Sequence, residues 1–263
     1  MKTSYLWIIA VLITAGSAFY QKTTGPTYPI KDKTEINGKV IRYKLERSHS
    51  TSEDYTLKIE TKDSLISGML TWKRFKSNDS LTSEKMTYFN DTLRAVIPAQ
   101  PSAGKVQYRV ELSNQGTIIP LTDKDVVMRF KNDVPMWILI PHIIFMFSMM
   151  LLSTRTGLET FAVAPKFNKL TFITLFFMIG GGMILGPITQ KFAFGAFWTG
   201  FPFGHDLTDN KTLIALIAWI VAIWKMKKSS NPKPWVIGAA IVTFIVFLIP
   251  HSVMGSEIDY TKK

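Results

Sequence analysis

The sequence VPMWILIPHIIFMFSMMLLS, residues 134–153, contains no acidic or basic side chain apart from one histidine. A run of this length and apolarity matches the hydrocarbon thickness that a membrane-spanning helix must cross. The residues before it are polar and charged, whereas those after it, up to residue 252, are mostly apolar. This step in composition predicts two parts, a polar domain over 21–133 and a transmembrane domain over 134–252.

Further apolar runs extend this pattern in both directions. The transmembrane domain is predicted to hold four helices, at 136–153, 170–188, 212–225 and 234–250. Near the start of the chain, the run over 5–20 is short for a span and long for the core of a signal peptide. Gly16-Ser17-Ala18 fits a cleavage site. Residues 1–20 are therefore either a transmembrane anchor or a signal peptide.

Basic residues predict the orientation in the membrane. They gather in the loops over 153–169 and 225–233, where Glu159 is the one acid. These basic residues are Arg155, Lys166, Lys169, Lys225, Lys227, Lys228 and Lys233. The positive-inside rule places both loops in the cytoplasm. The chain is then expected in the cytoplasmic (inner) membrane, with the polar domain and the C-terminal tail, 253–263, outside the cytoplasm.

Composition excludes several classes of function. The chain has no cysteine, which rules out disulfides, thiolate metal sites, thiol catalysis and covalent attachment of haem. The formal net charge is +12, but the basic residues are spread over the polar domain or placed where membrane topology requires them. We therefore expect a lipid bilayer and no nucleic acid as partner.

The polar domain shows short alternating runs between turn signals, a pattern typical of β-strands. The runs are Lys39–Leu45, Tyr55–Glu60, Ser67–Phe75, Thr92–Ile97 and Lys105–Leu112. Their spacing predicts an immunoglobulin-like β-sandwich. The segment Ile97–Pro101 followed by Lys105–Leu112 resembles a late hairpin of a fibronectin type III domain. We found no nucleophile–base pair here, so this domain is interpreted as a module that docks an extracytoplasmic protein partner.

Three histidines are predicted to share one end of the helices. His142 lies two turns into its span, His205 lies in the loop before the third span of the domain, and His251 follows the last span. Ionisable groups inside a membrane are costly and mark functional sites by default. Neutral imidazole binds haem iron, copper and zinc. The alternative is a buried histidine that bonds a neighbouring carbonyl or hydroxyl group.

The loop that contains His205 is rich in aromatic residues. It reads QKFAFGAFWTGFPFGHDLTDNKT over 190–212, with glycine and proline between the aromatic rings. This pattern indicates either an aromatic belt at the membrane interface or a lid over a flat apolar ligand. Asp206 is a candidate to orient the neighbouring imidazole. Asp209 is a second acidic candidate behind the ligands, or else a cap of the following helix.

The same loop resembles the tryptophan-rich "WWD" segment of cytochrome c maturation proteins. The resemblance is carried by Gly195-Ala196-Phe197-Trp198, by Asp209-Asn210-Lys211 and by Ala215–Trp219, with His142 and His251 flanking the loop in the family's order. Phenylalanine, glycine or histidine stands where the family has further tryptophans. The resemblance implies haem handling on the outer membrane face, with Trp198 and His205 beside the cofactor.

These patterns leave three functions open. The first is a non-catalytic membrane protein whose polar domain docks a partner and whose helices anchor or assemble a complex. The second is a haem-binding protein, for haem handling or b-type electron transfer, with His142 and His251 as axial ligands. The third is transport of protons or ions, or a copper site formed by His142, His251 and Met254. No pattern indicates an enzyme of a specific class.

Overall fold

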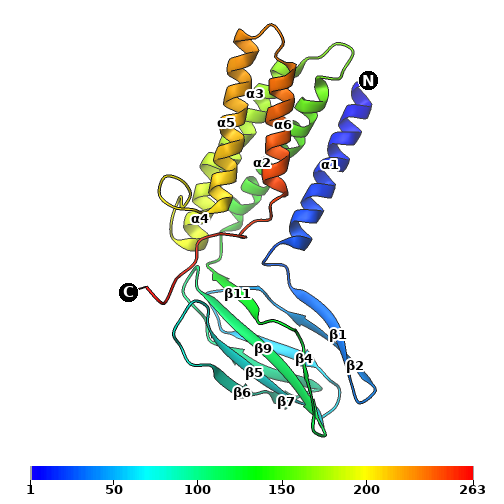
Figure 1. The fold of residues 1–263 in the computed structure, drawn as a ribbon, viewed down its shortest axis with the longest axis vertical. Helices are drawn as coiled ribbons and strands as arrows, with labels where there is room; N and C mark the ends of the chain where they lie inside the picture. Colours follow the sequence, from blue (N-terminus) through cyan, green and yellow to red (C-terminus); the bar gives the residue numbers. More distant parts are fainter. Residues whose placement is uncertain (1, 263) are drawn as a thin grey trace. The chain divides into compact units, whose positions relative to one another are not determined.

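The computed structural model describes residues 2–262, which pack as two compact units (Figure 1). The helical unit contains residues 2–26 together with Val134–Ser256. The β unit contains Thr27–Asp133 together with the tail from Glu257 to residue 262. The chain passes from one unit to the other after residues 26, 133 and 256.

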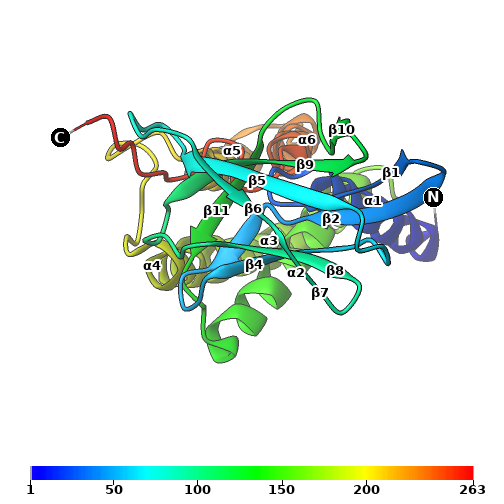
Figure 2. The same ribbon diagram turned by 90° about the horizontal axis from the view of Figure 1, so that it is seen from below.

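The described part of the β unit forms eleven strands in three sheets, and all strands but β3 are labelled in Figure 1 or Figure 2. One sheet has the order β3-β11-β9-β5-β6 with β10 paired to β9, a second has the order β4-β8-β7, and β1 pairs with β2. The strands are β1 (Ile30–Ile36), β2 (Lys39–Leu45), β3 (Ser48–Ser50), β4 (Tyr55–Glu60), β5 (Ser67–Arg74), β6 (Thr82–Lys85), β7 (Thr87–Phe89), β8 (Thr92–Ile97), β9 (Lys105–Asn114), β10 (Thr117–Pro120) and β11 (Val126–Lys131).

Alternation of apolar and polar residues builds the core of this unit. In β4 every second residue is buried, so Leu57 and Ile59 point inward while their neighbours are exposed. Strands β5, β8, β9 and β11 contribute Leu70, Leu93 and Phe130, among others, to the same core. The five sequence-predicted strands correspond to β2, β4, β5, β8 and β9, so the β character of this region is confirmed.

The expected hairpin between β8 and β9 is wrong. Strand β8 pairs with β4 and β7, whereas β9 pairs with β5, β10 and β11 in a different sheet. Pro98 and Pro101 lie between the two strands and have no N–H to donate to a ladder. The connection therefore carries the chain from one sheet to another instead of forming a tight turn.

The helical unit contains α1 (Thr3–Thr24), α2 (Met136–Glu159), α3 (Phe167–Met178), α4 (Gly186–Phe194), α5 (Leu207–Lys228) and α6 (Lys233–Leu248). A π-helical segment, η1 (Ile179–Leu185), joins α3 and α4 into one continuous helix of 28 residues. Within residues 2–262, this helix, α1, α2 and α5 are long and apolar enough to cross a membrane, and α6 is a shorter apolar helix. The expectation of a membrane protein is confirmed at this level.

Most helices extend further than the sequence analysis expected; the span expected at 170–188, for example, runs from Phe167 to Phe194. Helix α5 begins at Leu207 instead of 212, and α2 continues to Glu159 instead of 153. Arg155 and Glu159, which were assigned to a loop, are thus helical and buried, and an ion pair of 2.6 Å joins them. Their spacing of four residues places both side chains on one helix face, where the opposite charges compensate each other away from water.

Helix α1 packs as a member of the helical unit. Leu6, Ala10 and Ser17 lie on one buried face of α1. The Arg155 guanidinium lies 5.2 Å from the ring centroid of Trp7, and Gln21 donates from Nε2 to the carbonyl oxygen of Phe247 at 2.6 Å. That carbonyl belongs to the last turn of α6, whose terminal carbonyls have no partner within their own helix. Removal of α1 would therefore uncover a buried charge and leave the end of α6 without this donor.

We expect α1 to remain attached to the chain after membrane insertion. The buried Ser17 lies at the centre of the sequence that fits a cleavage site and on the packed face of α1, so cleavage there would remove contacts that the helical unit uses. Intact mass spectrometry of the protein purified from membranes should give the mass of the chain with α1 present. A mass that corresponds to a chain beginning near residue 19 would contradict this assignment.

Candidate functional site

Polar groups of the helical unit gather at the end where α4 and α6 finish and α5 begins (Figure 1). We call this the loop end, because the connection over 195–206 lies there. Its buried polar side chains are Asp206, Asp209, Lys211 and Thr212. Most of an apolar bundle offers no partner for such groups, so each must find hydrogen bonds nearby.

Asp206 joins three parts of the loop end. Its Oδ1 accepts a hydrogen bond from the backbone N–H of Thr208 at 2.8 Å, which caps the start of α5. Its Oδ2 accepts from both the backbone N–H (2.9 Å) and the hydroxyl (3.0 Å) of Ser256, and from the Thr199 hydroxyl at 3.2 Å. One carboxylate therefore fixes a helix start, the loop and the chain that follows α6.

Asp209 holds the loop from the first turn of α5. Its Oδ2 accepts from the backbone N–H of Thr199 at 2.6 Å and from that of Gly200 at 2.9 Å. A Cβ atom at Gly200 would lie 2.6 Å from the Cβ of Asp209, so only glycine allows this approach. We call Asp206, Asp209, Thr199, Gly200 and Ser256 together the carboxylate lock.

The carboxylate lock fixes a loop whose aromatic side chains face outward. Phe201 and Phe203 are 68% and 83% exposed, and Phe197 is exposed as well. Trp198 donates from its indole nitrogen to the Phe201 carbonyl oxygen at 3.0 Å, which stiffens the turn. His205 is exposed, and Asp206 directs its carboxylate to Thr208, Thr199 and Ser256 instead of to this imidazole.

Lys211 is a buried cation that the sequence analysis did not single out. It is 1% exposed, and its ammonium group donates to the carbonyl oxygen of Ile249 and to Nδ1 of His251, each at 2.9 Å. The ring of Phe247 lies 5.5 Å away. A lysine close to a helix start is disfavoured by the helix dipole. The position of Lys211 two residues after Asp209, near the start of α5, was therefore a sequence signal that a nearby group accepts its hydrogen bonds.

His251 is held by this lysine. Because an ammonium group can only donate, Nδ1 of His251 accepts, and the proton of the neutral ring sits on Nε2. Although the residue as a whole is exposed, desolvation of the imidazole and the adjacent Lys211 ammonium both lower the pKa of His251. The imidazole is therefore neutral, with its Nδ1 lone pair engaged.

His142 has the opposite tautomer. Its Nδ1 lies 3.0 Å from the carbonyl oxygen of Gly181 in η1, and since a carbonyl can only accept, Nδ1 carries the proton. The Nε2 lone pair of the neutral ring is then free. Gly181 lies so close to α2 that an added Cβ would meet Phe145 at 2.9 Å. This close approach brings the Gly181 carbonyl within reach of His142.

The two histidines therefore differ in their fitness as metal or haem ligands. A ligating histidine commonly donates its other ring N–H to a carbonyl or carboxylate, as His142 does. His251 would have to give up the proton on Nε2 or its bond to Lys211. Among residues 2–262, no three His, Asp or Glu side chains are grouped so that they could hold a metal ion. In this arrangement His142 keeps one ring nitrogen without a hydrogen bond among the described residues, whereas the Nδ1 of His251 is engaged by Lys211.

Comparison with known proteins gives no relative: no family model, no curated protein and no solved structure matches this chain.

We expect the carboxylate lock to govern the order of the loop. Asp206→Ala removes a helix cap, which alone costs about 0.5–2 kcal/mol, and also frees Ser256. Asp209→Ala releases two backbone N–H groups of the loop. Both variants should show a lower thermal midpoint and faster proteolysis within 195–206. His205→Ala is the matched control and should behave like the parent protein; a loss of stability there equal to that of Asp206→Ala would contradict the lock.

Proposed function

We propose that this chain is a non-catalytic integral membrane protein that assembles a complex. The helical unit anchors it in the cytoplasmic membrane, and the β unit, together with the aromatic loop over 195–206, docks a protein partner outside the cytoplasm. One observation carries this proposal: the buried carboxylates of the loop end are engaged in holding a loop that presents large aromatic side chains. The polar groups thus serve to shape a contact surface.

The exposed aromatic side chains suit a binding surface. Phe201 and Phe203 project from a segment that the carboxylate lock already fixes, so little conformational freedom is lost when they are covered. Aromatic residues on a rigid support are the usual anchors of protein interfaces. The loop therefore has the features of one side of a protein–protein interface.

The proposed orientation rests on the opposite end of the helices. Lys225, Lys227 and Lys228 end α5, and Lys225 also lies 4.6 Å from the ring of Trp235 at the start of α6. A basic turn flanked by tryptophans is typical of a cytoplasmic membrane interface. Burial of Arg155 removes one charge from the neighbouring loop, but Lys166 and Lys169 still support the same orientation. The loop end then lies outside the cytoplasm.

A photo-crosslinking residue placed at Phe201 or Phe203 tests the proposal in native membranes. We expect each position to give a discrete adduct with a protein, because the side chains face a partner. The same residue at Phe172, exposed on α3, is the control and should give adducts with lipid only. Lipid adducts alone at all three positions would show that the loop is an interfacial belt and would contradict the docking role.

The geometry of His142 supports a second candidate, a haem-handling protein. The Nδ1–H of His142 is bonded to a carbonyl, and its Nε2 is available to iron, in keeping with the local resemblance to cytochrome c maturation proteins. In this candidate, His142 would bind haem, the aromatic loop would cover the flat ring, and Lys211 would bring a positive charge to the same end. Bound haem would supply iron-centred redox chemistry.

Absorption spectra of the purified protein from haem-replete cells test this candidate. Bound haem gives a Soret band, together with separate α and β bands that sharpen on reduction, and His142→Ala should abolish these bands. His251→Ala should retain the band, because Lys211 already engages that imidazole. A blank spectrum, together with no metal in elemental analysis, would exclude stable haem binding and leave partner docking as the function.

A further inference from the structure

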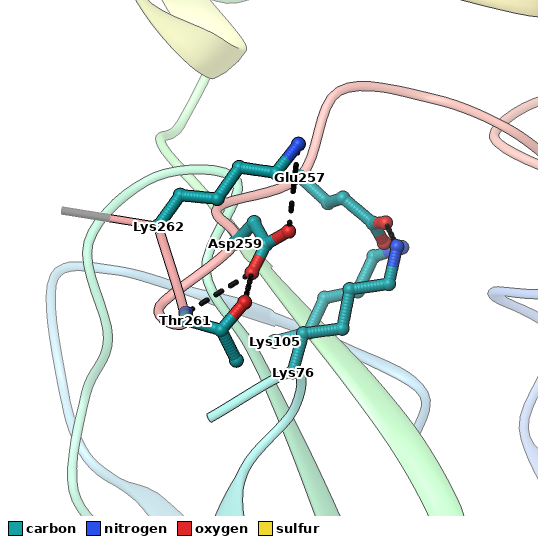
Figure 3. A network of polar contacts seen from close by, with 6 residues as sticks. All are labelled: Lys76, Lys105, Glu257, Asp259, Thr261 and Lys262. Atoms are coloured by element: carbon teal, nitrogen blue, oxygen red, sulfur yellow. Dashed lines mark hydrogen bonds and ion pairs between the residues drawn. The ribbon is translucent and has the colours of Figure 1, made fainter. Parts of the chain in front are cut away.

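The C-terminal tail binds to one basic corner of the β unit (Figure 3). Glu257 lies between two lysines: its carboxylate forms an ion pair with Lys105 at 2.5 Å and another with Lys76. Burial raises the pKa of Glu257, but the hydrogen bonds from Lys105 and Lys76 outweigh it and hold the pKa below its usual range. The carboxylate is therefore ionised and paired.

The next residues of the tail continue along the same corner. The backbone N–H of Ile258 donates to the carbonyl oxygen of Ala103 at 3.2 Å, a main-chain contact of the kind that peptide-binding surfaces use. The guanidinium of Arg74 lies 4.5 Å from the ring centroid of Tyr260. At Gly104, a Cβ atom would come within 2.8 Å of the Tyr260 hydroxyl, so the absence of a side chain there leaves room for the ring.

The fit of this tail is incomplete. The Tyr260 hydroxyl is buried, and no hydrogen-bond partner is found for it among the described residues. Among the described residues, the hydrogen bonds and the ion pair of the Asp259 carboxylate are with Thr261 and Lys262 of the tail itself. A buried hydroxyl without a partner costs free energy, and part-exposed ion pairs contribute little. The corner thus recognises a carboxylate, a backbone N–H and an aromatic ring. The tail supplies all three, but its Tyr260 hydroxyl and its Asp259 carboxylate find no hydrogen-bond partner among the described residues of the corner.

We propose that Arg74, Lys76, Lys105 and the Ala103 carbonyl form a receptor site for an acidic segment of the partner protein, one with an aromatic residue three positions after a carboxylate. The C-terminal tail occupies this site in cis. The proposal rests on the proposed docking function and names the chemistry of the partner. A better-fitting acidic segment displaces the tail.

Displacement follows from how the tail is held. Attachment to the same chain gives the tail an effective concentration on the order of millimolar, against which a partner segment must compete. The apparent dissociation constant of a competing segment equals its intrinsic value divided by the fraction of open sites. Each change that opens the tail therefore strengthens partner binding without altering the site itself.

The test measures fluorescence anisotropy of a labelled peptide, SEIDYTK, with the sequence of residues 256–262. The protein is the full chain in detergent or nanodiscs, compared with the same chain ended after Ser256. We expect the peptide to bind the truncated chain and to bind the full chain at least threefold more weakly. Binding should weaken with salt, because the contacts are ionic.

Single substitutions distinguish an effect on the binding site from an effect on folding. In the truncated chain, Lys105→Glu and Lys76→Glu should each weaken peptide binding at least threefold, whereas Lys33→Glu, on exposed β1, should leave it unchanged. A Tyr260→Phe peptide should bind as well as the parent peptide or better. In case truncation impairs folding, Glu257→Lys in the full chain opens the tail by charge repulsion and should give the same gain in peptide binding.

Two results would overturn the proposal. One is no peptide binding to the truncated chain and to the Glu257→Lys chain while their circular dichroism matches the parent. The other is equal binding to the open and full chains, which would show that the tail does not occupy the site. Neither result affects crosslinking at Phe201 and Phe203. Protein adducts there without peptide binding would leave the docking function standing and remove only this receptor site.

Discussion

The loop end of the helical unit depends on the burial of two carboxylates beside a helix start. A buried carboxylate is tolerated only when hydrogen-bond donors surround it. Asp206 and Asp209 obtain these donors from the first turn of α5, from the loop and from Ser256 beyond α6. The start of α5, the loop before it and the chain that follows α6 must therefore be in place together. This requirement fixes the position of all three segments.

The basic groups beside these carboxylates divide into different roles because of their hydrogen bonds. Lys211 donates to His251 and to the carbonyl oxygen of Ile249 after α6, so a cation stabilises the same end as the two carboxylates. His142 bonds a carbonyl of η1 and keeps one nitrogen free. From residue type alone the two histidines were equivalent. They differ in which ring nitrogen carries the proton. Structural and ligand-binding histidines can differ in this one respect.

Patterns with a short period were predictable, whereas partners distant in sequence were not. Alternation located β4 and β8 to the residue, and apolar runs located the helices. Helix ends were misplaced where charged residues continue a helix in a buried position, as Arg155 does beside Trp7. The sequence showed Asp206 next to His205, yet the carboxylate turns to Ser256, fifty residues away. The tail site on Lys76 and Lys105 gave no local signal either.

The π-helical segment makes α3, η1 and α4 a single rod of 28 residues. At a rise of about 1.5 Å per residue such a rod is roughly 42 Å long, and the hydrocarbon core of a bilayer is about 30 Å thick. The rod must therefore tilt or carry α4 into the headgroup layer. Because α4 leads directly into the aromatic loop, bilayer thickness would then set the depth at which that loop sits. Membrane composition thus becomes a physical input to the depth at which the aromatic side chains are presented.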